Sequence, residues 1–177
     1  MKKLFMTLLL LICATKAFCQ LNYPLNINDM AQIKFPGTPI ERSMPGKLVV
    51  YAYQGIQQGY VVQAAHLKKP TIGPSASDIR DDFFNDQIKL EIDALKGTLL
   101  YKKNIQIDGV NGVEYSYNFV IQNVKIYNYN RFVFLNEVGI DYYIMSREPL
   151  KQEDKVLNDY FNSFKITISK KNINSLK

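Results

Sequence analysis

The chain has 177 residues, a formal net charge of +6 and two cysteines. Its lysines and arginines are scattered, whereas a nucleic-acid-binding protein concentrates them into a patch or stripe. Both cysteines lie within the first 19 residues, so the rest of the chain offers no disulfide, no thiol nucleophile and no cysteine-based metal site.

The N-terminus has the layout of a secretory signal peptide. Two lysines precede an apolar run over 4–14, and small side chains follow it. This pattern predicts a signal over 1–19, with cleavage after Cys19 or, as second choice, after Ala17. The run is shorter than the ~20 residues that span a bilayer, so we expect no transmembrane anchor after cleavage. The protein is therefore expected to be periplasmic or secreted.

The remaining chain is expected to form one domain. We predict a loose lead-in over 20–29, a single α+β domain over 30–168 and a polar tail over 169–177. Alternating apolar and polar residues, broken by Gly and Pro, predict strands in the first part of this domain. These strands lie around 33–35 and over 39–43, 47–54 and 60–67, with a turn over 55–59 between the last two.

A helix is predicted over 78–96 because the hydrophobic period changes from two to nearly four. Ser77 is suited to its N-cap and Gly97 to its C′ position. The apolar stripe of this helix is formed by Ile79, Phe83, Leu90 and Ala94, widened by Phe84, Ile88, Ile92 and Leu95.

Strands return after this helix, over 98–107, 113–121, 124–135 and 138–146. Asp108-Gly109 and Asn111-Gly112 are turn dipeptides, which indicates antiparallel pairing. A second helix is predicted to begin at Pro149, and a short strand over 165–168 ends the domain. The apolar face of this helix comprises Leu150, Leu157, Tyr160, Phe161 and Phe164.

Short motifs in this order resemble the PsbP/Mog1-like superfamily, as found in small exported bacterial proteins. They are Phe35-Pro36-Gly37-Thr38-Pro39, Asp108-Gly109, Gly112-Val113-Glu114 and Phe161-Asn162-Ser163-Phe164. The resemblance implies an α/β/α-type sandwich around an antiparallel sheet. Together with the predicted elements, it gives an expected α+β fold with about six or more strands covered by two helices. It also implies an accessory or partner-binding protein more often than an enzyme. The matched positions are structural, so no functional residue follows from it.

The sequence contains no complete catalytic motif. His66 is the sole histidine, and a nucleophile elbow G-x-S-x-G is absent. Asp78, Asp82 and Asp86 share one helix face, where they either hold a hard cation or, as we favour, form a solvated face at the helix N-terminus. We therefore expect no metal site and no cofactor.

Glu114 follows a predicted turn and is the carboxylate that a general acid or base would require. Glu41, Asp108 and Asp141 are its partners only by elimination. The alternative is a surface strand residue paired with a lysine across the sheet, which contributes under about 1 kcal/mol.

The most distinctive feature is a row of tyrosines on three successive strands. Tyr127 and Tyr129 share a strand face with Arg131, and an exposed tyrosine row with a nearby arginine is typical of a binding surface. Alternatively, tyrosine is there because it favours strands, and a covering helix buries the face. The expected ligand-binding residues are Tyr127, Tyr129, Arg131, Tyr117 and Glu114.

We therefore expect an exported, non-enzymatic binding or accessory module of the bacterial envelope. A sheet face or the groove beside the long helix would hold a protein or small-molecule partner, and we expect no nucleic acid. The alternatives are a carboxylate-dependent hydrolase built on Glu114, or a structural subunit of an envelope complex. The subunit alternative predicts a large exposed apolar patch.

Overall fold

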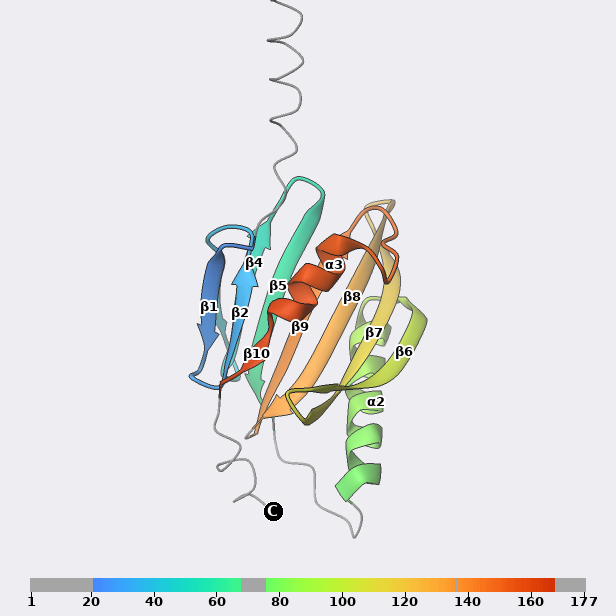
Figure 1. Ribbon diagram of the computed structural model, residues 1–177. Helices are drawn as coiled ribbons and strands as arrows, with labels where there is room; N and C mark the ends of the chain where they lie inside the picture. The colour runs from blue at the N-terminus through green and yellow to red at the C-terminus, as the bar shows by residue number, and fades with distance from the viewer. Residues whose placement is uncertain (1–20, 68–75, 136, 168–177) are drawn as a thin grey trace, which may run out of the picture.

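The computed structural model describes residues 21–67, 76–135 and 137–167 (Figure 1). Its centre is a seven-stranded antiparallel sheet of order β3-β4-β5-β9-β8-β7-β6. The strands of this sheet are β3 (Ile40–Met44), β4 (Leu48–Gln54), β5 (Gln58–His66), β6 (Thr98–Ile107), β7 (Val110–Ile121), β8 (Val124–Leu135) and β9 (Val138–Ser146). The predicted signal peptide over 1–19 and the predicted tail over 169–177 lie outside the described residues.

A second sheet of three strands has the order β1-β2-β10. Its strands are β1 (Tyr23–Ile27), β2 (Ala31–Phe35) and β10 (Lys165–Ile166). The loose lead-in expected over 20–29 is therefore wrong for β1, which pairs along its whole length with β2. Ile27 is fully buried at the end of β1, so this segment is part of the core.

Different elements cover the two faces of the large sheet (Figure 1). On one face, α3 (Lys155–Ser163) and the small sheet pack around a core that includes Tyr160. On the other face, α2 (Ala76–Ala94) buries Phe84 and Ile88 against the sheet. The expected α+β class with two helices is confirmed, but a small sheet shares one outer layer with α3.

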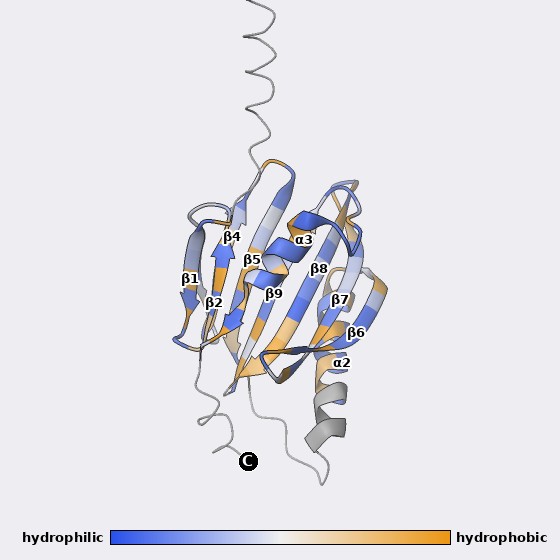
Figure 2. Ribbon diagram, viewed as in Figure 1, coloured by the Kyte–Doolittle hydropathy of each residue, from blue (hydrophilic) through white to orange (hydrophobic). Residues whose placement is uncertain are grey.

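Alternation along each strand assigns neighbouring residues to different faces. On β7, Tyr115 and Tyr117 belong to the α2 core. On β8, Asn128 pairs with Tyr117 and so lies on the α2 face, whereas Tyr129 belongs to the α3 core. Figure 2 shows that β8 changes from hydrophilic to hydrophobic along its length. The hydrophilic part of β8 includes buried residues: Asn130 is fully buried.

The end of α2 differs from the prediction. Lys96, not Gly97, has the left-handed conformation, with φ of 51°. The Lys96 N–H donates to the Asp93 carbonyl, and the Gly97 N–H donates to the Ile92 carbonyl at 2.8 Å, which together form a Schellman motif. Gly97 is needed for space, because a Cβ there would lie 3.0 Å from the Asn118 carbonyl oxygen.

Two further boundaries differ from the prediction. Asp108-Gly109 forms the β6–β7 turn with positive φ at both residues, whereas Asn111-Gly112 lies inside β7. The helix expected to begin at Pro149 begins after Asp154, because the Asp154 carboxylate accepts the Lys151 N–H at 2.8 Å and holds a turn before the helix. Within the described ranges, neither helix has the length and apolar composition needed to cross a membrane.

Candidate functional site

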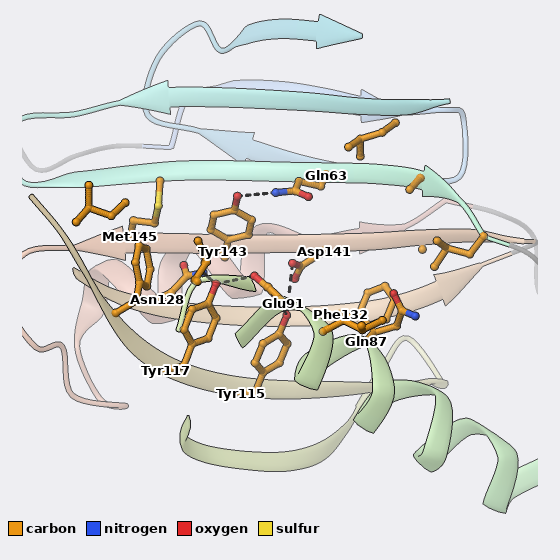
Figure 3. Close-up of a pocket in the computed structure, with 18 residues that line it drawn as sticks. Gln63, Gln87, Glu91, Tyr115, Tyr117, Asn128, Phe132, Asp141, Tyr143 and Met145 are labelled. Carbon is orange, nitrogen blue, oxygen red and sulfur yellow. Dashed lines mark hydrogen bonds between the residues drawn. The ribbon is translucent and has the colours of Figure 1, made fainter. Parts of the chain in front are cut away.

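A pocket of about 650 Å³ lies between α2 and the large sheet (Figure 3). It exists because α2 packs mainly over β7 and β8, while side chains of β4, β5 and β9 complete the wall. Its volume is within the usual range for small-molecule sites. The lining residues are Leu48, Gln63, Ala65, Leu67, Gln87, Leu90, Glu91, Leu95, Tyr115, Tyr117, Phe119, Ile121, Asn128, Phe132, Gly139, Asp141, Tyr143 and Met145.

Glu91 is the polar contact between α2 and the floor of the pocket. The Tyr115 hydroxyl donates to Glu91 Oε2 at 2.5 Å, and the Tyr117 hydroxyl donates to Glu91 Oε1 at 2.7 Å. The two rings stack with centroids 6.2 Å apart, so both hydroxyls reach one carboxylate (Figure 3). This arrangement fixes α2 against β7 and places a carboxylate at the pocket.

Asn128 continues this network and leaves one atom free. Its Nδ2 donates to the Tyr117 hydroxyl at 2.7 Å. Tyr117 has a single hydroxyl proton, which goes to Glu91, so the Asn128 group that faces Tyr117 must be the donor. Asn128 Oδ1 is then an acceptor, and it is buried without a partner within the described structure. The residue is only 2% exposed, so this orphaned oxygen is costly unless a ligand or water reaches it.

Asp141, on β9, is the second carboxyl of the pocket. Its Oδ2 lies 3.5 Å from the Tyr115 hydroxyl, and its Oδ1 is buried without a partner among the described atoms. Burial of the carboxyl and the nearby Glu91 charge raise the pKa of Asp141 well above its ordinary value. The Tyr115 hydroxyl therefore faces both carboxyl groups of the pocket, and its shorter contact is the one to Glu91.

Tyr143 and Gln63 form the remaining polar part of the wall. The Gln63 amide donates to the Tyr143 hydroxyl at 2.6 Å across the β5–β9 pairing. Burial and the Asp141 charge raise the pKa of Tyr143 above its ordinary range, so the hydroxyl stays protonated. Leu67 and Phe132 contribute apolar surface beside these groups.

The expected site residues do not come together in this pocket. Tyr117 lines it, but Tyr127, Tyr129, Arg131 and Glu114 lie on the opposite face, as the strand register shows. Tyr129 is 4% exposed, and its hydroxyl accepts the Leu150 N–H at 2.6 Å. The prediction of an exposed tyrosine row is therefore wrong at Tyr129, because side chains of the α3 layer cover that face. Tyr127 is half-buried under Lys125, whose Nζ lies 5.4 Å from the ring centroid.

Glu114 is the centre of a buried ion-pair network. Lys103 Nζ and Arg131 Nε each lie 2.7 Å from its carboxylate oxygens, and the Tyr101 hydroxyl donates to it at 3.2 Å. Burial of the carboxyl opposes ionisation, but hydrogen bonds and charges from Lys103 and Arg131 outweigh it and lower the pKa of Glu114. The expected cross-sheet lysine pairing is confirmed, although the carboxylate is buried and an arginine joins the pair.

The other residues considered for chemistry are dispersed. His66 and Asp82 are exposed, and the side chain of Asp78 lies outside the described residues. The Asp108 carboxylate accepts the Ile166 N–H at 2.9 Å and so has a structural contact. Across the described ranges, no three His, Cys, Asp or Glu side chains are grouped as metal ligands. The carboxyl groups that do line the pocket, among the described residues, are those of Glu91 and Asp141.

Sequence reasoning missed Glu91, Asn128 and Gln63, and it named Asp141 only by elimination. The pairing of Tyr117 with Asn128 on the pocket floor could have been predicted from the sequence, because the predicted ranges of β7 and β8 end within three residues of the observed ones. A short turn between them pairs Tyr117 with Asn128 and places both on one face. Glu91 depends on how α2 is rotated against the sheet, which the strand pattern does not encode.

Comparison with solved structures identifies a similar fold. The cyanobacterial PsbP (CyanoP) from Synechocystis sp. PCC 6803 matches with a TM-score of 0.57 and 15% identity, over 86% of this chain and 95% of that chain. A Pseudomonas aeruginosa protein of unknown function matches at 0.44 and 11%, over 70% of this chain and 81% of that chain. No protein-family model matches the sequence, and no curated protein matches it significantly. The PsbP-like fold implied by the sequence motifs is confirmed.

Proposed function

We propose that this domain is an exported, non-enzymatic binding module of the bacterial envelope that holds a small organic ligand between α2 and the large sheet. The observation that carries the proposal is the pocket itself, whose lining includes Asn128 and Asp141, each with a buried side-chain oxygen that has no partner among the described residues. A native fold retains unpaired buried acceptors at a cost, and a bound ligand would offset it. The groove beside the long helix, one of the two locations expected from the sequence, supplies the site.

A thermal-shift screen of the purified protein against amines, sugars, nucleotides, lipids and metals tests the proposal. A ligand at 100 times its dissociation constant stabilises the native state by about 2.7 kcal/mol. Ala65→Phe places a ring in the pocket that Ala65 lines and should abolish the shift. Ala52→Phe is the matched control, because Ala52 lies on the same strand face of neighbouring β4 outside the lining. Equal shifts in both variants would contradict the proposal.

A role as a structural subunit is the second candidate, because apolar side chains are exposed near the α2-proximal ends of β6 and β7. Leu99 and Leu100 are 46% and 47% exposed, and Val120 is 61% exposed. Changing Leu100 and Val120 together to Ser should dissociate any complex captured by crosslinking in cells without weakening ligand binding. The hydrolase alternative loses its central residue, since Glu114 is held by Lys103 and Arg131.

A further inference from the structure

We propose that the pocket selects small organic cations, namely amines that carry an apolar or aromatic group, through Asp141, Asn128 Oδ1 and the tyrosine rings beside them. This inference rests on the proposed function and names the ligand class of the same pocket. Three properties of the lining lead to it: the sign of its charge, the identity of its free polar atoms, and the chemistry of its walls.

Among the described lining residues, all ionisable groups that carry charge are acids. Glu91 and Asp141 are these acids, and none of the described lining residues is Lys, Arg or His. Anionic ligands would therefore meet two carboxyl groups with no counter-charge, which is strongly unfavourable at low dielectric. A cation instead gains attraction from Glu91, and its charge favours release of the proton that Asp141 holds in the empty pocket, so that Asp141 then attracts it as well.

The free polar atoms of the floor are acceptors. Tyr117 and Tyr115 have committed their protons to Glu91, and Asn128 Nδ2 is committed to Tyr117. Among the buried lining atoms of the described structure, Asn128 Oδ1 and Asp141 Oδ1 remain as acceptors without a partner. An ammonium group has several N–H donors and no acceptor, so it complements this set. A hydroxyl ligand could satisfy only one of the two oxygens as a donor.

The walls fit an organic cation better than a metal ion. Aromatic faces attract cations through their ring quadrupole, and Tyr115, Tyr117 and Phe119 present a continuous series with centroids 6.2 and 5.7 Å apart. A hard divalent cation prefers about six oxygen ligands in a tight shell. That shell would leave the apolar part of the pocket, formed by residues such as Leu67 and Phe132, without a role.

Three probes that share a phenyl group on a two-carbon chain test the inference: 2-phenylethylammonium, 2-phenylethanol and 3-phenylpropionate, each titrated calorimetrically into the purified protein. The cation should bind about tenfold tighter than the alcohol, since a charged hydrogen bond is roughly twice as strong as a neutral one. It should also bind more tightly than the anion. Calcium is titrated in a separate experiment as the probe for a metal site.

Asp141→Asn is the decisive variant because it keeps the side-chain shape and removes the ionisable group. It should weaken the cation about tenfold while the alcohol changes less than about twofold. Asp93→Asn is the matched control, since Asp93 is an exposed acid on the same helix as Glu91, and it should change neither affinity. Circular dichroism establishes that each variant is folded.

The outcomes separate this inference from the proposed function. If the alcohol or the anion binds most tightly and Ala65→Phe abolishes that binding, the pocket binds ligands but the cation selectivity is refuted. Calcium binding that Asp141→Asn removes also refutes the organic-cation class. If none of the three probes binds and the wider screen is silent, both the inference and the proposed function fail.

Discussion

Glu114→Gln should destabilise the domain although the residue lies on the opposite face of the sheet from the proposed pocket. The Glu114 side chain is 5% exposed, and its partners Arg131 and Lys103 are 19% and 47% exposed. The lysine pair is solvated and contributes under about 1 kcal/mol. The buried arginine pair is worth more when broken, because the Arg131 charge is left without its carboxylate.

Together these losses predict a decrease of about 3 kcal/mol in the free energy of unfolding at neutral pH. For a domain of this size that corresponds to a Tm lower by about 6–12 °C. The lowered pKa of Glu114 means that its contribution is complete above the ordinary carboxyl pKa and is lost as the pH falls through the lowered value. The difference between wild type and variant should therefore be constant near neutrality and shrink in acid.

Urea unfolding from pH 3 to 8 measures this difference. Asp159→Asn is the control, because Asp159 pairs with Lys155 on the exposed surface of α3 at 2.5 Å and should cost less than about 0.5 kcal/mol. Adding Arg131→Met to Glu114→Gln should cost less than the sum of the two single changes. A Glu114→Gln effect below about 0.5 kcal/mol at pH 7 would refute the buried-network account.

Other changes probe the two sheet faces. Tyr129→Ala should lower the unfolding free energy by about 3 kcal/mol because it empties a buried core position, whereas urea midpoints unchanged from wild type would restore the exposed-row interpretation. Asp141→Asn should gain stability relative to wild type as the pH rises from 4 to 8. The raised pKa of Asp141 means that, over this range, the unfolded wild type releases a proton that the native wild type keeps, which destabilises the native state. Parallel plots of unfolding free energy against pH for the two proteins would contradict this. Glu91→Gln should lower the free energy of unfolding by about 1–2 kcal/mol and speed amide hydrogen exchange in α2. The reason is that the Tyr115 and Tyr117 hydroxyls lose a charged acceptor. Unchanged exchange would show that the Glu91 contacts do not hold the helix.

Most of the large sheet could be predicted because its strands alternate clearly and tight turns join them. The predicted ranges 98–107, 124–135 and 138–146 match β6, β8 and β9. β1 was not predicted, because this edge strand of the small sheet contains Pro24 and Asn26, which disfavour strands, and shows little alternation of apolar and polar residues. Its pairing with β2 is a tertiary property.

The candidate site was harder to predict than the fold. The tyrosine row was found, but alternation distributes it over both faces, so Tyr127 and Tyr129 are separated from Tyr115 and Tyr117 by the thickness of the sheet. Which face each helix covers is a tertiary property that the alternation of a single strand does not reveal. The alternative that placed Glu114 at the surface was also wrong about its burial, because acids are seldom buried without a partner and the second partner, Arg131, was not foreseen.

The most direct test of the account is the map of amide NMR shifts when 2-phenylethylammonium is added to the purified protein. The account predicts that the largest shifts fall around Gln63 on β5, Glu91 on α2, Asn128 on β8 and Asp141 on β9, which surround the pocket. Shifts confined to α3, around Tyr160 and Phe161, would contradict it.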